Sequence, residues 1–187
     1  MTQDSDLFGN KIKVKPKRKS KLELDLLEFE KTTFNERLKR LEFINKFGPK
    51  NYSLMGDMEF VFIYNEIERC YIYGNFIATL ILSQSFIEKL LSSFLISKGF
   101  EKETNYGLEK MLKCVIKKNL IHPNICEMVN KIRLKRNPFV HSKDWDYPHL
   151  LSKRTFENKK LPEEQLENDA KEAMQILFVV FTIKLGS

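Results

Sequence analysis

The stretch Phe76-Ile-Ala-Thr-Leu-Ile-Leu-Ser-Gln-Ser-Phe-Ile-Glu-Lys-Leu-Leu-Ser-Ser-Phe-Leu-Ile-Ser-Lys98 is the most apolar part of the chain. Its side chains repeat at spacings of three and four, which is the period of one face of an α-helix. The residues that follow this period are Leu80, Gln84, Ile87, Leu91 and Phe94. Gly99 comes directly after the stretch and suits the left-handed residue that ends many helices. The stretch therefore predicts a central helix that ends just before Gly99.

Segments on both sides of this stretch carry the same helical period. Before it, apolar residues recur at spacings of three and four from Phe60 to Tyr71. After it, similar stripes run from Tyr106 to Lys118, from Ile125 to Ile132 and from Ala170 to Phe181. No Asn-Gly or Asp-Gly pair and no long alternating run favours a β-hairpin. We predict an all-α bundle of four to five core helices, with extra N-terminal helices.

Prolines mark the starts of the last two predicted helices. Pro123 suits a first helical turn, and Pro162 is followed by Glu163 and Glu164, whose charges favour a helix N-terminus. Residues 142–161, between these two helices, are rich in polar groups. We predict a long loop there.

The N-terminal part of the pattern predicts two further helices. The first carries Leu22, Leu26 and Phe29 on one face. Thr33 and Glu36 have the spacing of a capping box, which predicts the start of a second helix. Gly48-Pro49 would end that helix. Its predicted inward residues are Phe34, Leu38 and Leu41.

The charge of the chain is concentrated at its N-terminus. The formal net charge of the 187 residues is +7, with 32 lysines and arginines against 25 acidic residues. Seven of the basic residues lie between Lys11 and Lys21, so the remainder is nearly neutral. Self-repulsion in this segment favours a flexible arm. We predict a basic tail over residues 1–21, a helical extension over 22–54 and a helical domain over 55–187.

Cysteine usage and hydropathy indicate a soluble, cytoplasmic protein. The three cysteines are an odd number and widely spaced, and no apolar signal core follows Met1, so we expect reduced thiols. The apolar stretch is interrupted by Gln84, Glu88 and Lys89, whereas a bilayer span needs about 20 residues with few charges. We expect no membrane partner.

The stretch from Asn130 to His141 carries the most chemistry. Arg133 and Arg136 lie three residues apart and would share one helix face. Pro138 lacks an amide donor and clashes with the preceding turn, so we expect the helix to kink or end near Asn137. An unbroken helix would place positions 136 and 141 about 140° apart. With a break, the two side chains can converge on one ligand.

Arginine, asparagine and histidine together match the needs of RNA cleavage. A guanidinium offers a fork of donors to a phosphate, and an imidazole exchanges a proton at neutral pH. RNA supplies its own nucleophile, the 2′-hydroxyl, so no metal is required. Arg136 and His141 would then supply positive charge and proton transfer. The alternative is a plain helix C-terminus, where cations are favoured in any case.

The segment Arg136-Asn137-Pro138-Phe139-Val140-His141 resembles the signature of the HEPN superfamily (higher eukaryotes and prokaryotes nucleotide-binding). In that family an arginine, usually followed by a polar residue such as asparagine, precedes a histidine by four to six residues. The order of predicted helices is also similar, with a long apolar helix before a short helix, the motif helix, a loop and a closing helix. The resemblance spans residues 55–185, and residues 1–54 have no counterpart.

The resemblance implies a helical bundle that dimerises and places two motifs across a shared cleft. Active members are metal-independent endoribonucleases, and many are toxins or abortive-infection effectors in anti-phage defence. The implied partners are RNA, a second copy of the chain, and an antitoxin or another defence protein. By the same resemblance, Arg136 would bind the scissile phosphate, His141 would act as general base or acid, and Asn137 would orient phosphate or ribose.

Two alternatives to an active nuclease stay open. The first is a catalytically inactive HEPN module that binds RNA or a partner protein. The second is an unrelated helical scaffold in which the side chains of Arg136 and His141 point apart.

Other candidate residues have weaker patterns. Glu88, in the central helix, is either a partner that orients Arg136 or an exposed residue at the helix edge, and Arg133 is a possible supporting cation. Trp145 and Tyr147 either stack a base or pack over the bundle end.

The sequence predicts no metal and no cofactor. Cys114, His122 and Cys126 lack the paired spacing of a zinc site. No glycine-rich phosphate loop is present, so a nucleotide triphosphatase is unsupported. His149, in the predicted loop, is expected at the surface.

Overall fold

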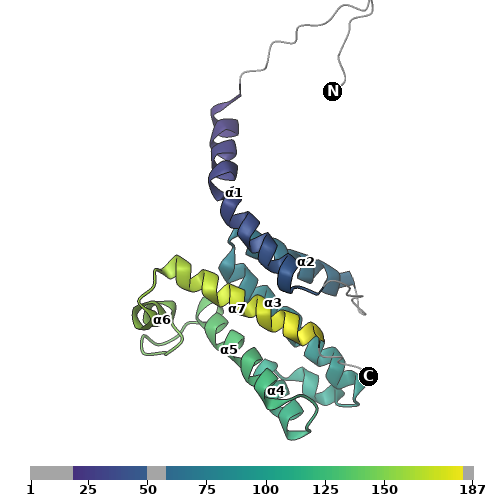
Figure 1. Cartoon of the computed structure of the whole chain (residues 1–187). Helices are drawn as coiled ribbons and strands as arrows, with labels where there is room; N and C mark the ends of the chain where they lie inside the picture. The colour runs from purple at the N-terminus through teal and green to yellow at the C-terminus, as the bar shows by residue number, and fades with distance from the viewer. Residues whose placement is uncertain (1–18, 50–57, 183–187) are drawn as a thin grey trace, which may run out of the picture. The chain divides into compact units, whose positions relative to one another are not determined.

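The computed structural model describes residues 19–49 and 58–182, which fold into seven α-helices and one short 3-10 helix without a strand (Figure 1). This confirms the predicted all-α class. The predicted basic tail lies outside the described residues up to position 18, as do residues 50–57 and 183–187. The elements are α1 (Lys21–Phe47), α2 (Met58–Tyr73), α3 (Phe76–Ser97), η1 (Glu101–Asn105), α4 (Leu108–Lys117), α5 (Pro123–Val140), α6 (Leu151–Asn158) and α7 (Pro162–Thr182). Backbone contacts divide the chain into two units, Met1–Asn35 and Glu36–Ser187.

Helix α3 is the centre of the second unit, as its apolar sequence predicts. It packs against α2, α5 and α7 and also contacts α4 and η1. Leu80, Phe86 and Leu95 are fully buried on it. Burial of each such side chain stabilises the fold by roughly 1.5–3 kcal/mol. The predicted stripes of α2, α4, α5 and α7 supply most of the remaining buried core.

Helix α3 also has the length and composition of a membrane-spanning helix, and it is the one such helix in the described part of the chain. Half of its apolar window is buried inside the structure. Core helices of soluble proteins meet the same criteria of length and composition, so these criteria are weak evidence for a membrane span.

Helices α2 and α3 each end at a glycine in a left-handed conformation. At the end of α3, Gly99 takes a left-handed conformation (φ +79°), and the Phe100 N–H donates to the Leu95 carbonyl at 2.8 Å. This is the Schellman arrangement, and it confirms the predicted end. Helix α2 ends in the same way at Gly74 (φ +81°), where the Asn75 N–H donates to the Cys70 carbonyl at 2.8 Å.

Helix α1 is continuous, so the predicted break at Thr33 is wrong. The Thr33 hydroxyl donates to the Phe29 carbonyl one turn back at 2.9 Å, which is an interaction of the helix interior. The capping box lies instead at the start of α1. There the Ser20 N–H donates to Glu23 Oε2 at 2.6 Å, and the Glu23 N–H donates to Ser20 Oγ at 3.2 Å.

The inward face of α1 is also different from the predicted one. The residues predicted to face inward, Phe34, Leu38 and Leu41, are exposed. Its buried residues are Arg40, Phe43 and Ile44. At about 100° per residue these two sets lie on nearly opposite sides of the helix.

The contacts of Arg40 explain how a charged residue is accommodated on the buried face of α1. Its Nε donates to Glu167 Oε1 on α7 at 2.8 Å, and its Nη1 donates to the Ile72 carbonyl in the last turn of α2 at 3.4 Å. The guanidinium also lies over the Phe76 ring, 4.9 Å from its centre. A buried charge with these partners is compensated, so Arg40 connects α1 to α2, α3 and α7.

The predicted loop over residues 142–161 is only partly a loop, because it contains helix α6. Arg154 on this helix is buried and donates to Asp169 on α7. Its Nε also donates to the His149 carbonyl at 3.1 Å. A tertiary ion pair therefore links helix α6 to α7, and a polar sequence pattern does not reveal such a contact.

Candidate functional site

Helix α5 continues through Pro138 to Val140, so of the two predicted outcomes, a kink or an end near Asn137, the end is wrong. Proline lacks the N–H that would donate to the carbonyl of residue 134. The Tyr147 hydroxyl donates to that Leu134 carbonyl, at the long distance of 3.5 Å. Tyr147 thus contacts the motif helix.

His141 is the first residue after α5, and its backbone is extended (φ −136°, ψ 135°). Its N–H donates to the Asn137 carbonyl at 2.9 Å, which holds the chain at the helix end. Because the backbone departs from the helix here, the imidazole returns toward Arg136. The distance from Arg136 Nη1 to His141 Nε2 is 3.4 Å, so the guanidinium donates when that nitrogen carries its lone pair.

The five residues singled out from the sequence line one groove with a volume of about 600 Å³, open to solvent. They are Glu88, Arg133, Arg136, Asn137 and His141. We call this the α3–α5 groove. Its lining also includes Gln84 from α3 and residues 105–110 and Lys113 from the end of η1 and from α4.

The α3–α5 groove has a net positive charge. Its lining holds four cations against two carboxylates; the cations are Lys110, Lys113, Arg133 and Arg136, and the carboxylates are Glu88 and Glu109. A groove with this balance attracts polyanions over a distance set by the ionic strength.

Glu109 neutralises part of that charge. Its Oε1 accepts from Lys113 Nζ at 2.7 Å, and its Oε2 lies 3.2 Å from Arg133 Nη1. The Lys113 hydrogen bond, followed by the nearby Arg133 charge, lowers the pKa of Glu109 from its ordinary value. Arg133 also donates to Asn130 Oδ1 at 2.8 Å. Arg133 is therefore held by its own chain.

Two buried polar atoms of the groove lining have no hydrogen-bond partner among the described residues. They are Arg136 Nε, a donor, and Gln84 Oε1, an acceptor. Within the same described residues, no ion pair joins Glu88 to Arg136, and Glu88 is half-buried. Arg136 therefore keeps donor capacity beyond its contact with His141.

A buried ion network next to the groove fixes α5 and α6 to α7. Asp169 has a fully buried carboxylate that accepts from Arg154 on α6 and from Gln165 at 3.0 Å. Its Oδ1 also lies 2.9 Å from Lys135 Nζ. Lys135 directly precedes Arg136, so this network holds the motif helix in place. The sequence analysis missed Asp169, although its place one helical turn before the buried Ala173 was an available signal.

The predicted absence of a metal concerned Cys114, His122 and Cys126. The described residues contain no group of three or more histidine, cysteine or acidic side chains able to hold an ion. His122 caps α5, since its Nδ1 accepts from the Asn124 N–H at 3.3 Å.

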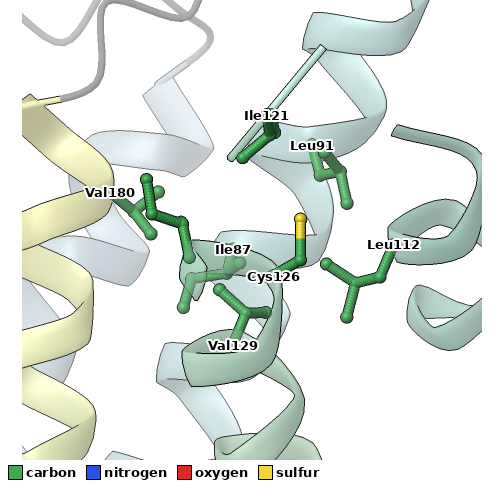
Figure 2. Close-up of a pocket in the computed structure, with 8 residues that line it drawn as sticks. Ile87, Leu91, Leu112, Ile121, Cys126, Val129 and Val180 are labelled. Atoms are coloured by element: carbon green, nitrogen blue, oxygen red, sulfur yellow. The ribbon is translucent and has the colours of Figure 1, made fainter. Parts of the chain in front are cut away.

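The Cys126 thiol lies beside an apolar cavity of about 20 Å³, among Ile87, Leu91 and Val129 (Figure 2). Burial raises the pKa of this thiol, so it stays protonated at neutral pH and is a poor metal ligand.

Trp145, in the segment after His141, is 85% exposed, so the interpretation that it packs over the bundle end is wrong; Lys153 Nζ lies 5.6 Å from its ring centre. His149 is half-buried, and its ring centre lies 5.5 Å from that of Tyr147. Burial, and then the Arg154 charge, lower the pKa of His149.

Comparisons of the chain with protein-family models, with curated proteins and with solved structures give no match. The geometry of the α3–α5 groove is therefore the basis for assigning a function.

Proposed function

We propose that the α3–α5 groove is the active site of a metal-independent endoribonuclease of the HEPN type. The observation that carries this proposal is the contact between Arg136 Nη1 and His141 Nε2, at 3.4 Å, inside a solvent-open groove with a net positive charge. A guanidinium that can donate hydrogen bonds to a phosphate and an imidazole that can transfer a proton are thus close enough to contact the same phosphodiester.

The proposed reaction uses the 2′-hydroxyl of the RNA as the nucleophile and needs one base and one acid. A base takes the proton of the 2′-hydroxyl, whose oxygen forms a bond to phosphorus while the bond from phosphorus to the 5′-oxygen breaks. An acid protonates the leaving 5′-oxygen, and a 2′,3′-cyclic phosphate remains. Arg136 would bind the non-bridging oxygens, where negative charge develops, and Asn137 would orient the phosphate or ribose. His141 would be the base or the acid.

The described lining of one groove contains a single imidazole, His141. Base and acid steps by two separate imidazoles therefore require a second chain. This supports a homodimer in which two copies of His141 serve one cleft. The resemblance of residues 136–141 to HEPN proteins further supports a toxin or anti-phage effector, with an antitoxin or another defence protein as partner.

The proposal is tested with an RNA oligonucleotide and the DNA of the same sequence, both incubated with the purified chain in EDTA. The RNA should be cut and the DNA should stay intact, because DNA lacks the nucleophile. A chain that cuts both equally, or cuts only after a divalent ion is added, would disprove a metal-independent transesterification.

A binding module without turnover is the second candidate. The observation that favours it is the same single imidazole, because one chain alone lacks a separate acid and base. In that case wild-type protein would bind RNA and leave it intact, and Arg136→Ala would weaken the binding. The oligonucleotide assay distinguishes the two candidates.

Changing Glu109 to glutamine should strengthen RNA binding. The substitution removes the carboxylate that engages Lys113 and Arg133, so both cations become available to phosphates. Each additional phosphate contact should steepen the plot of log binding constant against log salt by about 0.7 for single-stranded RNA. Fluorescence anisotropy over a range of salt concentrations measures this change.

The matched control for this change is Glu127→Gln on α5. Glu127 is exposed, lies outside the groove lining and is only 4.0 Å from Lys131 in a surface ion pair. The RNA affinity of the Glu127→Gln variant, and the salt dependence of that affinity, should equal those of the wild type. Equal salt dependence for Glu109→Gln and the wild type would contradict phosphate binding in this groove.

A further inference from the structure

Helix α1 exposes an apolar stripe, interrupted by Lys31, on the side opposite its buried residues. Five large apolar side chains on this stripe have exposed fractions between 39% and 56%. They are Leu24, Leu27, Phe34, Leu38 and Leu41. Isolated apolar residues are common on surfaces, but a row of five along one helix indicates an interaction site.

The spacing of the stripe is that of a coiled coil. Residues 24, 27, 31, 34, 38 and 41 alternate in steps of three and four, which is the heptad pattern of positions a and d. Leu24, Lys31 and Leu38 take position a, and Leu27, Phe34 and Leu41 take position d. We call these six residues the α1 seam. The seam occupies a different side of α1 from Arg40, Phe43 and Ile44, so it stays available after the helix has packed.

We infer that the α1 seam pairs with the α1 seam of a second copy in an antiparallel two-stranded coiled coil. A self-complementary face of this kind pairs around a two-fold axis, as most homodimers do. In the antiparallel register each a residue meets a d residue. Leu24 faces the partner's Leu41, and Leu27 faces the partner's Leu38.

Charged residues in and beside the seam favour the antiparallel orientation. A parallel pair would place Lys31 against the partner's Lys31, with two like charges in the interface. The antiparallel pair places Lys31 against the partner's Phe34, where an ammonium can lie over a ring. A parallel pair would also bring Glu23 next to the partner's Glu28, which is a further repulsion.

The edges of the antiparallel pair are complementary as well. At one edge, position e of one helix faces position e of the other, which pairs Lys21 with the partner's Glu42 twice by symmetry. Arg37 lies over the Tyr73 ring of its own chain, 5.1 Å from the centre, so its guanidinium already has a partner there.

This inference is independent of the nuclease proposal, because the α1 seam and the lining of the α3–α5 groove share no residue. If the chain does not cleave RNA, the inference about the α1 seam is not contradicted. If the α1 seam does not pair, the proposed roles of Arg136 and His141 are not contradicted. The variant His141→Ala should keep the seam dimer.

Sedimentation equilibrium of the full chain tests the inference. The double variant Leu27→Glu/Leu38→Glu introduces charges that face each other in the seam and should halve the wild-type mass, with at least a 100-fold rise in the dissociation constant. The matched control is Leu22→Glu/Leu26→Glu, which makes the same chemical change at exposed positions of α1 outside the seam. The control should keep the wild-type mass, and circular dichroism should show equal helix content in all three proteins.

Orientation is tested by a charge reversal. Lys21→Glu should weaken self-association by creating a like-charge pair with Glu42, and Lys21→Glu/Glu42→Lys should restore it. A monomeric wild-type chain, or a mass that the seam variant leaves unchanged, overturns the inference. A dimer whose association the double reversal fails to restore overturns the antiparallel register.

Discussion

Replacing His141 with alanine is expected to lower the rate of RNA cleavage by about 100- to 10,000-fold, the usual contribution of a general acid or base. The imidazole lies 3.4 Å from Arg136 Nη1 and lines the groove, so its loss removes the proton-transfer group at the phosphate site. His141 is exposed, and the free energy of unfolding should change by no more than about 0.5 kcal/mol. Single-turnover cleavage and thermal unfolding measure the two quantities.

The matched control for this variant is His122→Ala. His122 is an exposed imidazole that caps α5 and does not line the groove. Its loss should cost about 0.5–2 kcal/mol of stability and leave the cleavage rate unchanged. Equal cleavage by the wild type and His141→Ala would show that the imidazole at position 141 has no catalytic role.

Replacing Asp169 with alanine is expected to lower the free energy of unfolding by about 3–5 kcal/mol. The carboxylate is fully buried and faces both Arg154 and Lys135. Its removal leaves the buried Arg154 charge without its counter-ion, and solvent cannot reach that charge to compensate it. Urea unfolding, followed by circular dichroism, measures the loss.

Glu172→Ala is the control that shows how much the free energy of unfolding falls when a different carboxylate near Lys135 is removed. Glu172 also pairs with Lys135, but its side chain is 39% exposed. Removal of this partly exposed partner should cost no more than about 1 kcal/mol. A loss below 1 kcal/mol for Asp169→Ala would mean that the network does not stabilise the packing of α5 and α6 on α7.

The bundle was predictable because its core helices have one unambiguous apolar face. In α4, Leu108, Met111, Leu112 and Val115 are buried as their spacing predicts. The end of α3 was equally readable, because Gly99 suits the left-handed conformation that a Schellman motif requires.

Helix α1 was misread because it has apolar residues on two sides. Leu38 and Leu41 have the period of a buried face, and only the packed structure shows that Phe43 and Ile44 are the residues used. Periodicity states that a face exists and does not state what covers it. The Thr33–Glu36 spacing was likewise ambiguous, because a capping box requires an interruption that the surrounding helix does not provide.

The candidate groove could be anticipated in part. Arg136, Asn137 and His141 are close in sequence, so a change of backbone direction at the helix end brings them together. Pro138 did not end the helix, since Tyr147 from the following segment donates to the carbonyl that the proline leaves unpaired. The hydrogen bond from Tyr147 to the Leu134 carbonyl is a tertiary contact, and so is the Arg154–Asp169 ion pair between α6 and α7. Local sequence patterns contain neither contact.

The most direct test of the proposed metal-independent endoribonuclease is to identify the RNA ends that the purified wild-type chain produces in EDTA. Mass spectrometry of the products should find 2′,3′-cyclic phosphates paired with 5′-hydroxyls, because the 2′-oxygen is the nucleophile and the 5′-oxygen leaves. Ends with 3′-hydroxyl and 5′-phosphate, or RNA that remains intact across substrates of varied sequence, would contradict a nuclease that works through Arg136 and His141.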